Sequence, residues 1–236
     1  MILFLTGTIQ PIGVIKTSLT DPIIREKHYC DAINFYLKAT KCKIVFVENS
    51  NWSIAHKFEE FKNRIEFLTY DGNKNGSKGK GFGEMEICEY FIKNSQFLVM
   101  DKVFMKITGR YKLINIHRIL TYYLKRSTEN DTMIDLKNKG LYSDSRCFIS
   151  NSEFLSRFLF PQKKLIDDSK GYYFEHALAT AAKKSINEGQ MNLLFPAPPI
   201  YKGIYATDNI AYSSSWLRSV LKHIYYKIKS IYYVHS

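Results

Sequence analysis

The sequence has few cysteines and no long apolar run, and both absences limit the classes of protein it can be. Its 236 residues contain 4 cysteines, with no CxxC pair and no histidine spaced to complete a zinc site, so we expect reduced thiols. No run of eighteen apolar residues occurs, and the apolar N-terminus lacks the basic start of a signal peptide. We therefore expect a cytoplasmic protein with no membrane-spanning segment.

Acidic residues and tryptophan are also scarce. There are 22 Asp and Glu against 34 Lys and Arg, which gives a formal net charge of +12, and 2 Trp against 17 Tyr and 16 Phe. A strongly basic surface suits nucleic acid, anionic lipid or a phosphorylated small molecule, and net charge alone does not separate them. Hydrophobic residues make up 45% of the chain and charged residues 24%, the balance of a globular protein.

Short apolar runs alternate with helix-period segments in the first half of the chain. We expect strands over residues 2–9, 43–47, 65–69 and 102–107. Helices are expected between them, from Asp21-Pro22 through Leu37, over 54–63 and from about 84 to 94. This alternation predicts an α/β fold with a mostly parallel central sheet flanked by helices, which binds ligands at the carboxyl ends of its strands.

The second half of the chain is less regular. Helices are expected over residues 115–124, 152–160 and 171–184, with a strand or loop over 144–148. We expect one domain over residues 1–215, followed by an amphipathic helix over 216–236.

Glycine and lysine are concentrated in the segment from Asp71 to Glu86, after an expected strand and before an expected helix. It contains five glycines and three lysines: Gly72, Gly76, Gly79, Gly81, Gly83, Lys74, Lys78 and Lys80. Glycines allow close approach of backbone N–H groups, and lysines and a helix N-terminus add positive charge, so phosphate is the expected ligand. The segment lacks the GK[ST] ending of a Walker loop and is not placed as a Rossmann fingerprint. A solvated loop without a ligand is the alternative.

A second basic segment, KITGRY from Lys106 to Tyr111, stands at the end of the fourth expected strand. Lys106 and Arg110 flank Gly109, and the guanidinium fork of Arg110 suits phosphate or carboxylate. A basic strand end that pairs with a nearby acid is the alternative.

Together these segments resemble the first half of GT-A-type glycosyltransferases that build bacterial surface polysaccharides, such as capsule and lipopolysaccharide. The resemblance covers roughly residues 1 to 115 and implies that a nucleotide sugar binds over the first strand ends, with its diphosphate between the two basic segments. The donor-binding residues that it implies are Thr6, Gly7, Thr8, Glu48, Asn49, Lys80, Gly81, Gly83, Glu84, Lys106, Thr108, Gly109 and Arg110.

The sequence departs from this family at one point. Most GT-A enzymes hold a divalent metal with an Asp-x-Asp motif at the end of the fourth strand, where this chain has Thr108-Gly109-Arg110. Oriented cations can neutralise a leaving phosphate without a metal. We therefore expect no metal site and no cofactor beyond the nucleotide-sugar donor, although a divalent metal is not excluded.

Candidate catalytic residues lie in the second half. Glu175 and His176, at the start of an expected helix, are candidates for the general base, and Asp144 beside Arg146 is a further candidate, with Arg110 on the diphosphate. The alternative for Glu175 and His176 is a helix start in which the acid favours the dipole and the histidine packs. Residues 203–208 suit either a lid over the donor or a plain surface loop.

The C-terminal residues 216–236 combine apolar and aromatic residues at helical spacing with Arg218, Lys222, Lys227 and Lys229 on the other side. A helix of this kind is typical of an anchor on an anionic membrane, and a helix docked on the core is the alternative. The sequence thus favours a peripheral enzyme on the inner face of the cell membrane that transfers sugar to a saccharide or lipid-linked saccharide.

Two other functions are compatible with the composition. A nucleic-acid-binding protein would also be basic and aromatic, but no known nucleic-acid motif is present and most aromatics follow apolar periodicity, so we expect no nucleic-acid partner. A phosphotransferase would need a paired-acid magnesium site near the glycine-rich segment, and none is evident there, although Glu84 and Glu86 could serve.

Overall fold

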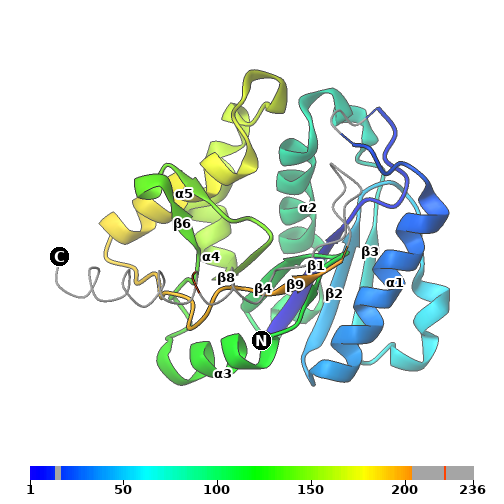
Figure 1. The fold of residues 1–236 in the computed structure, drawn as a ribbon, viewed down its shortest axis with the longest axis horizontal. Coiled ribbons are helices and arrows are strands. Elements are labelled where there is room, and N and C mark those ends of the chain that lie inside the picture. The colour runs from blue at the N-terminus through cyan, green and yellow to red at the C-terminus, as the bar shows by residue number, and fades with distance from the viewer. Residues whose placement is uncertain (14–16, 204–220, 222–236) are drawn as a thin grey trace.

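The protein folds around one five-stranded sheet, shown in a computed structural model that describes residues 1–13, 17–203 and 221 (Figure 1). The strand order is β3-β2-β1-β4-β8. The first four strands are parallel, and β8 pairs with β4 in the antiparallel direction. The strands are β1 (Ile2–Gly7), β2 (Lys43–Glu48), β3 (Ile65–Thr69), β4 (Val103–Thr108) and β8 (Cys147–Asn151). The α/β fold with a mostly parallel sheet is therefore confirmed.

Helices cover both faces of this sheet (Figure 1). On one face, α1 (Pro22–Ala39) and α3 (Ile116–Arg126) bury Tyr36 and Ile119 against strand residues such as Leu3. On the other face, α2 (Lys80–Asn94), α4 (Ser152–Phe154) and α5 (Phe174–Asn187) pack on strand residues such as Phe4. The strands are apolar on both faces because both faces are covered.

Local sequence sets where the first helix begins. The Asp21 carboxylate accepts hydrogen bonds from the N–H groups of Ile23 and Ile24, and Pro22 occupies the first turn, where no N–H partner is needed. This start agrees with the one expected from Asp21-Pro22.

Several expected elements differ in the structure. Residues 54–63 form a 3₁₀ segment, Ala55–Phe61, with a kink at Phe58 instead of an α-helix. Another 3₁₀ segment, Asn73–Lys78, precedes α2, which begins at Lys80, four residues earlier than expected. Residues 152–160 combine the short α4 with a π turn, Leu155–Leu159. Further 3₁₀ turns span Phe97–Val99, Asn138–Gly140, Phe160–Leu165 and Asp168–Lys170.

Two small antiparallel pairs complete the described fold. β5 (Lys112–Leu113) pairs with β9 (Tyr201–Lys202), and β6 (Leu136–Lys137) pairs with β7 (Tyr142–Ser143). Within the described residues, no helix has the length and apolar character needed to cross a bilayer. The boundary at 215, residues 204–208 of the segment 203–208 and, except for residue 221, the expected helix over 216–236 lie outside the described residues.

Candidate active site at the carboxyl ends of the strands

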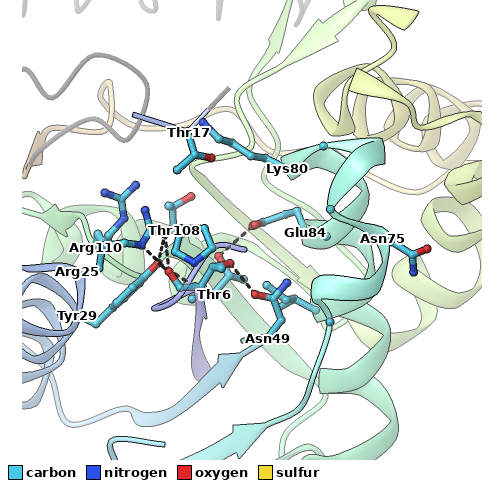
Figure 2. Close-up of a pocket in the computed structure, with 18 residues that line it drawn as sticks. Thr6, Thr17, Arg25, Tyr29, Asn49, Asn75, Lys80, Glu84, Thr108 and Arg110 are labelled. Atoms are coloured by element: carbon cyan, nitrogen blue, oxygen red, sulfur yellow. Dashed lines mark hydrogen bonds between the residues drawn. The ribbon is translucent and has the colours of Figure 1, made fainter. Parts of the chain in front are cut away.

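Two adjoining cavities open where β1, β2 and β4 end, the edge at which parallel sheets bind ligands, and Figure 2 shows the first of them. The first cavity, of about 130 Å³, lies over the ends of β1 and β2 and is bordered by the glycine-rich segment. The second, of about 550 Å³, lies between the start of α2, the end of β4 and the start of α5. Four residues line both cavities: Lys80, Glu84, Thr108 and Arg110.

The structure therefore brings the two basic segments together at one junction. Lys80 comes from the first turn of α2 and Arg110 from the turn after β4 (Figure 2). Most of the expected donor-binding residues line the first cavity: Thr6, Gly7, Thr8, Asn49, Lys80, Gly83, Glu84, Thr108 and Arg110. Gly81, Asp144 and Glu175 line the second. Glu48, Lys106, Gly109 and His176 line neither.

A buried arginine holds the chain that follows β1. The Arg25 Nε–H donates to the Thr8 carbonyl at 2.7 Å, and its Nη1 donates to the Leu19 carbonyl at 3.0 Å. The Tyr29 hydroxyl accepts from the Thr8 N–H at 2.9 Å. Burial lowers the pKa of Arg25, and the nearby charge of Arg110 lowers it further. Arg25 and Arg110 thus place two guanidinium groups at the first cavity, which favours an anionic ligand.

An amide at the end of β2 points its donor toward the first cavity. The Thr8 hydroxyl donates to Asn49 Oδ1 at 2.6 Å, which fixes the orientation of the amide. Asn49 Nδ2 lies 3.4 Å from the position that a Cβ on Gly83 would take. The absence of a side chain at Gly83 therefore keeps space open beside this N–H₂ group.

Glu48 does not have the donor-binding position expected from the sequence. Its side chain is fully buried, and its carboxylate accepts hydrogen bonds from the N–H groups of Ile9 at 2.8 Å and Trp52 at 2.9 Å. The N–H and hydroxyl of Ser50 also donate to it. Burial raises the pKa of Glu48, while these donors oppose the rise. Glu48 joins the loops after β1 and β2, so its place in the fold is structural.

Lys106 is likewise not at the cavity surface. It is fully buried, and its Nζ forms an ion pair with Glu84 and donates to the Ser145 carbonyl at 2.8 Å. The same Glu84 oxygen, Oε1, accepts from the Thr6 hydroxyl at 3.0 Å. Lys106 was expected to contact phosphate. It projects from the same face of β4 as Thr108 but stands two residues further from the strand end, so its side chain lies beneath the junction. It fixes Glu84, which does line both cavities.

Two of the expected phosphate-binding glycines make room for an acid. Asp168 Oδ2 accepts from the Gly81 N–H at 3.1 Å, at the N-terminus of α2. A Cβ on Gly81 would stand 2.6 Å from Asp168 Oδ1, and one on Gly79 would stand 2.4 Å from Asp168 Cβ. Gly79 also has φ +94°, a conformation that favours glycine. In this structure a carboxylate therefore occupies the Gly81 N–H, the group through which a bound phosphate would be held.

Gly109 brings the ends of β1 and β4 together. Its N–H donates to the Thr6 carbonyl at 2.9 Å, and a Cβ at this position would lie 2.6 Å from the same oxygen. Gly109 was expected to contact the donor, but in the structure it allows the backbones at the ends of β1 and β4 to approach each other closely. Thr6 and Thr108 consequently stand side by side at the floor of the site.

The second cavity carries a partly buried carboxylate. The Glu175 Oε1 accepts from the Ser145 hydroxyl at 2.7 Å, and burial raises the pKa of Glu175. Since the Ser145 carbonyl accepts from Lys106, the same lysine supports the surroundings of both Glu84 and Glu175. A carboxyl with a raised pKa in a cavity is a candidate for proton transfer.

Asp144 is held in a fixed ion pair. It accepts from Arg146 Nε at 2.8 Å and from Lys137 Nζ at 2.8 Å. Burial alone would raise the pKa of Asp144, but Arg146 and Lys137 together hold it well below its usual range. A carboxylate this firmly ionised is a poor proton acceptor. In the second cavity Asp144 instead holds the side chains of Arg146 and Lys137 in place.

His176 lines neither cavity. Its Nδ1 accepts from the Tyr173 N–H at 3.1 Å, and its ring stacks with those of Tyr172 and Tyr173 at 5.2 and 5.6 Å. This is the packing alternative weighed from the sequence. Of the two candidates for the base, only Glu175 lines a cavity.

Sequence reasoning missed Arg25, Tyr29, Ser145 and Asp168. Arg25 and Tyr29 are four residues apart in α1 and therefore share one face of the helix, which was the available signal. No sequence signal links Asp168 to Gly81, because the contact joins residues 87 positions apart. Within the described ranges, no group of three or more His, Cys, Asp or Glu side chains has a geometry that would hold a metal ion.

No known family model matches the sequence, and no curated protein matches it. Among solved structures, similarity is found to a glycosyltransferase involved in glycosylation of the PBCV-1 major capsid, at 7% identity over 82% of this chain and 81% of that chain, with TM-score 0.44. Mouse xyloside xylosyltransferase 1 gives 9% identity over 82% and 85%, with TM-score 0.44. A cytidylyltransferase from Leptospira borgpetersenii gives 10% over 84% and 76%, with TM-score 0.41. Similarity at this level supports no conclusion about activity, which must come from the site.

Proposed function

We propose that the protein is a glycosyltransferase that uses a nucleotide-sugar donor. The observation that carries the proposal is the junction of the two cavities. There Lys80 and Arg110 lie between a glycine-bordered cavity over β1 and β2 and a larger cavity lined by the carboxylate of Glu175. A diphosphate at the junction would place the nucleoside in the first cavity. The sugar and its acceptor would then occupy the second.

Sugar transfer requires positive charge close to the leaving diphosphate. Transfer breaks the bond between the anomeric carbon and the diphosphate oxygen, and negative charge develops on the nucleoside diphosphate that leaves. Lys80, Arg25 and Arg110 line the first cavity, so their cations are placed to stabilise that charge. We propose that these cations act in place of an Asp-x-Asp metal site.

The acceptor hydroxyl must lose a proton as its oxygen attacks the sugar. Glu175 is the residue we assign to accept it, because it lines the second cavity and its raised pKa lies closer to neutrality than that of an exposed glutamate. Ser145 orients the carboxyl by donating to Oε1. Asp144 and Arg146 supply a fixed polar wall in the same cavity.

We further propose that the acceptor is a saccharide or lipid-linked saccharide of bacterial surface-polysaccharide synthesis, such as capsule or lipopolysaccharide. The basic and aromatic residues of 216–236 support a peripheral position on the inner face of the cell membrane. Residues 216–220 and 222–236 lie outside the described structure, so this part of the proposal depends on the sequence.

The proposed activity has a direct test in the release of free nucleotide from nucleotide sugars, with water as a slow acceptor. We expect the purified full chain to release nucleotide from at least one of the UDP-, GDP-, CMP- or dTDP-sugars. Glu175→Gln should slow transfer to an added saccharide acceptor more than it slows hydrolysis, because only transfer from a sugar hydroxyl depends on that base. Absence of release from every donor, with and without manganese, would remove the proposed function.

A further inference from the structure

The stretch from 102 to 128 contains no acidic residue. Between Asp101 and Glu129 it carries seven basic residues: Lys102, Lys106, Arg110, Lys112, Arg118, Lys125 and Arg126. Lys106 and Arg110 belong to the candidate active site. The others lead into and through α3, which Figure 1 shows at the lower edge of the molecule. The stretch therefore places a second concentration of positive charge away from the cavities.

α3 separates an apolar side from a basic side. Ile116, Ile119, Leu120 and Tyr123 are buried against the sheet. Five exposed residues share the opposite face at helical spacing: His117, Arg118, Thr121, Leu124 and Lys125. Arg126, the last residue of the helix, is also exposed. Leu124 is 63% exposed, and Ile114, just before the helix, is 48% exposed. Large apolar side chains thus stand among cations on the outside of the molecule.

A like-charge pair adjoins this helix. Lys112 of β5 stands directly opposite Lys202 of β9 in the antiparallel ladder, an arrangement that destabilises a sheet. The segment before β9 is fastened to the start of α3, since Asn115 Nδ2 donates to the Pro198 carbonyl and Asn115 Oδ1 accepts from the Ile200 N–H, both at 2.9 Å. The two lysines are therefore kept near α3 at an electrostatic cost.

The cations of this region have no acidic partners in the described part of the chain. Carboxylates there pair with other lysines, such as Lys57, Lys137 and Lys163. No ion pair within residues 1–13, 17–203 and 221 involves the cations of α3, β5 or β9, which are Lys112, Arg118, Lys125, Arg126 and Lys202. Uncompensated charge of this kind complements an anionic surface.

We propose that the outer face of α3, with Lys112 and Lys202, docks on an anionic lipid bilayer. Basic side chains would meet lipid phosphates, and Leu124 and Ile114 would enter the interface between headgroups and acyl chains. The exposed apolar side chains favour a bilayer over a nucleic acid, whose phosphate backbone offers them no apolar contact. The inference does not depend on the proposed enzymatic activity, and α3 contributes no residue that lines either cavity.

Co-sedimentation of the full chain with vesicles tests this surface. Wild type should bind vesicles of phosphatidylcholine with phosphatidylglycerol, and bind phosphatidylcholine alone much more weakly. The Arg118→Glu/Lys125→Glu variant should partition at least about 30-fold less strongly onto the anionic vesicles. The loss of two cations at an anionic surface accounts for about 30-fold, and the two introduced carboxylates add repulsion. Leu124→Gln should weaken binding as well, because it removes an exposed apolar side chain without changing the net charge.

The matched control is Lys38→Glu/Lys62→Glu, which makes the same change of net charge at two exposed lysines outside this region. It should retain most of the binding of wild type. If both double variants lose vesicle binding equally, only the net charge matters. If the α3 variant loses no vesicle binding, other segments bind the vesicles. Either result overturns the proposal. So would a loss of affinity for a single-stranded RNA oligonucleotide without a loss of vesicle binding. Unchanged melting temperatures show that the variants are folded.

Discussion

Replacing Arg110 by alanine should lower the release of nucleotide from a nucleotide sugar by about 10²–10³-fold, the loss found when one preorganised donor to a developing anion is removed. The side chain is 6% exposed and lines both cavities, so it is placed where the diphosphate would leave. The measurement is kcat and KM for hydrolysis of the best donor. The larger part of the loss should fall on kcat, because charge develops during bond cleavage.

A conservative variant separates charge from geometry. Arg110→Lys keeps one positive charge but loses the planar fork, so it should recover part of the activity lost in Arg110→Ala. Thermal unfolding checks that both variants fold. Equal activity of wild type and Arg110→Ala, at equal stability, would remove Arg110 from the mechanism and with it the main support for a diphosphate at this junction.

Replacing Lys106 by methionine should destabilise the fold by about 3–5 kcal/mol, the usual cost of removing one partner from a buried ion pair. The Lys106 side chain is 1% exposed and the Glu84 side chain 20% exposed, so water cannot fully compensate the carboxylate that remains. The Ser145 carbonyl would also lose its donor. Thermal or denaturant unfolding of the two proteins measures the difference.

A double variant identifies the cause of this loss. Lys106→Met combined with Glu84→Gln removes the uncompensated charge, so its free energy of unfolding should lie above that of Lys106→Met alone. If Lys106→Met is as stable as wild type, the ion pair does not hold the floor of the site. A double variant less stable than Lys106→Met alone would also contradict this account.

The parallel part of the sheet could be predicted because its strands carry a local signal. Continuous apolar runs such as KIVFV at Lys43–Val47 are typical of strands buried on both faces, and the helices between them leave only a parallel arrangement. The antiparallel β8 could not be predicted in the same way. Its pairing with β4 joins Val103 to Asn151 across 48 positions and has no local pattern.

The site could be predicted to the level of segments, but individual side chains could not. Thr6, Asn49 and Arg110 line the cavities, as expected for residues at strand ends, and so does Lys80 at the start of α2. Lys106 and Glu48 also stand at or near strand ends, yet they are buried, because whether a polar residue faces the cavity or the interior depends on neighbouring layers. The place of Gly81 depends on Asp168, which is distant in sequence.

The most direct measurement of a nucleotide sugar at this site is thermal unfolding of the full chain with UDP-, GDP-, CMP- and dTDP-sugars. At least one donor should stabilise the protein by about 2.7 kcal/mol when its concentration is 100 times its dissociation constant. It should do so without manganese, and Arg110→Ala should show a smaller shift at the same donor concentration. If no nucleotide sugar raises the melting temperature in either condition, the cavities at the ends of β1, β2 and β4 do not bind such a donor.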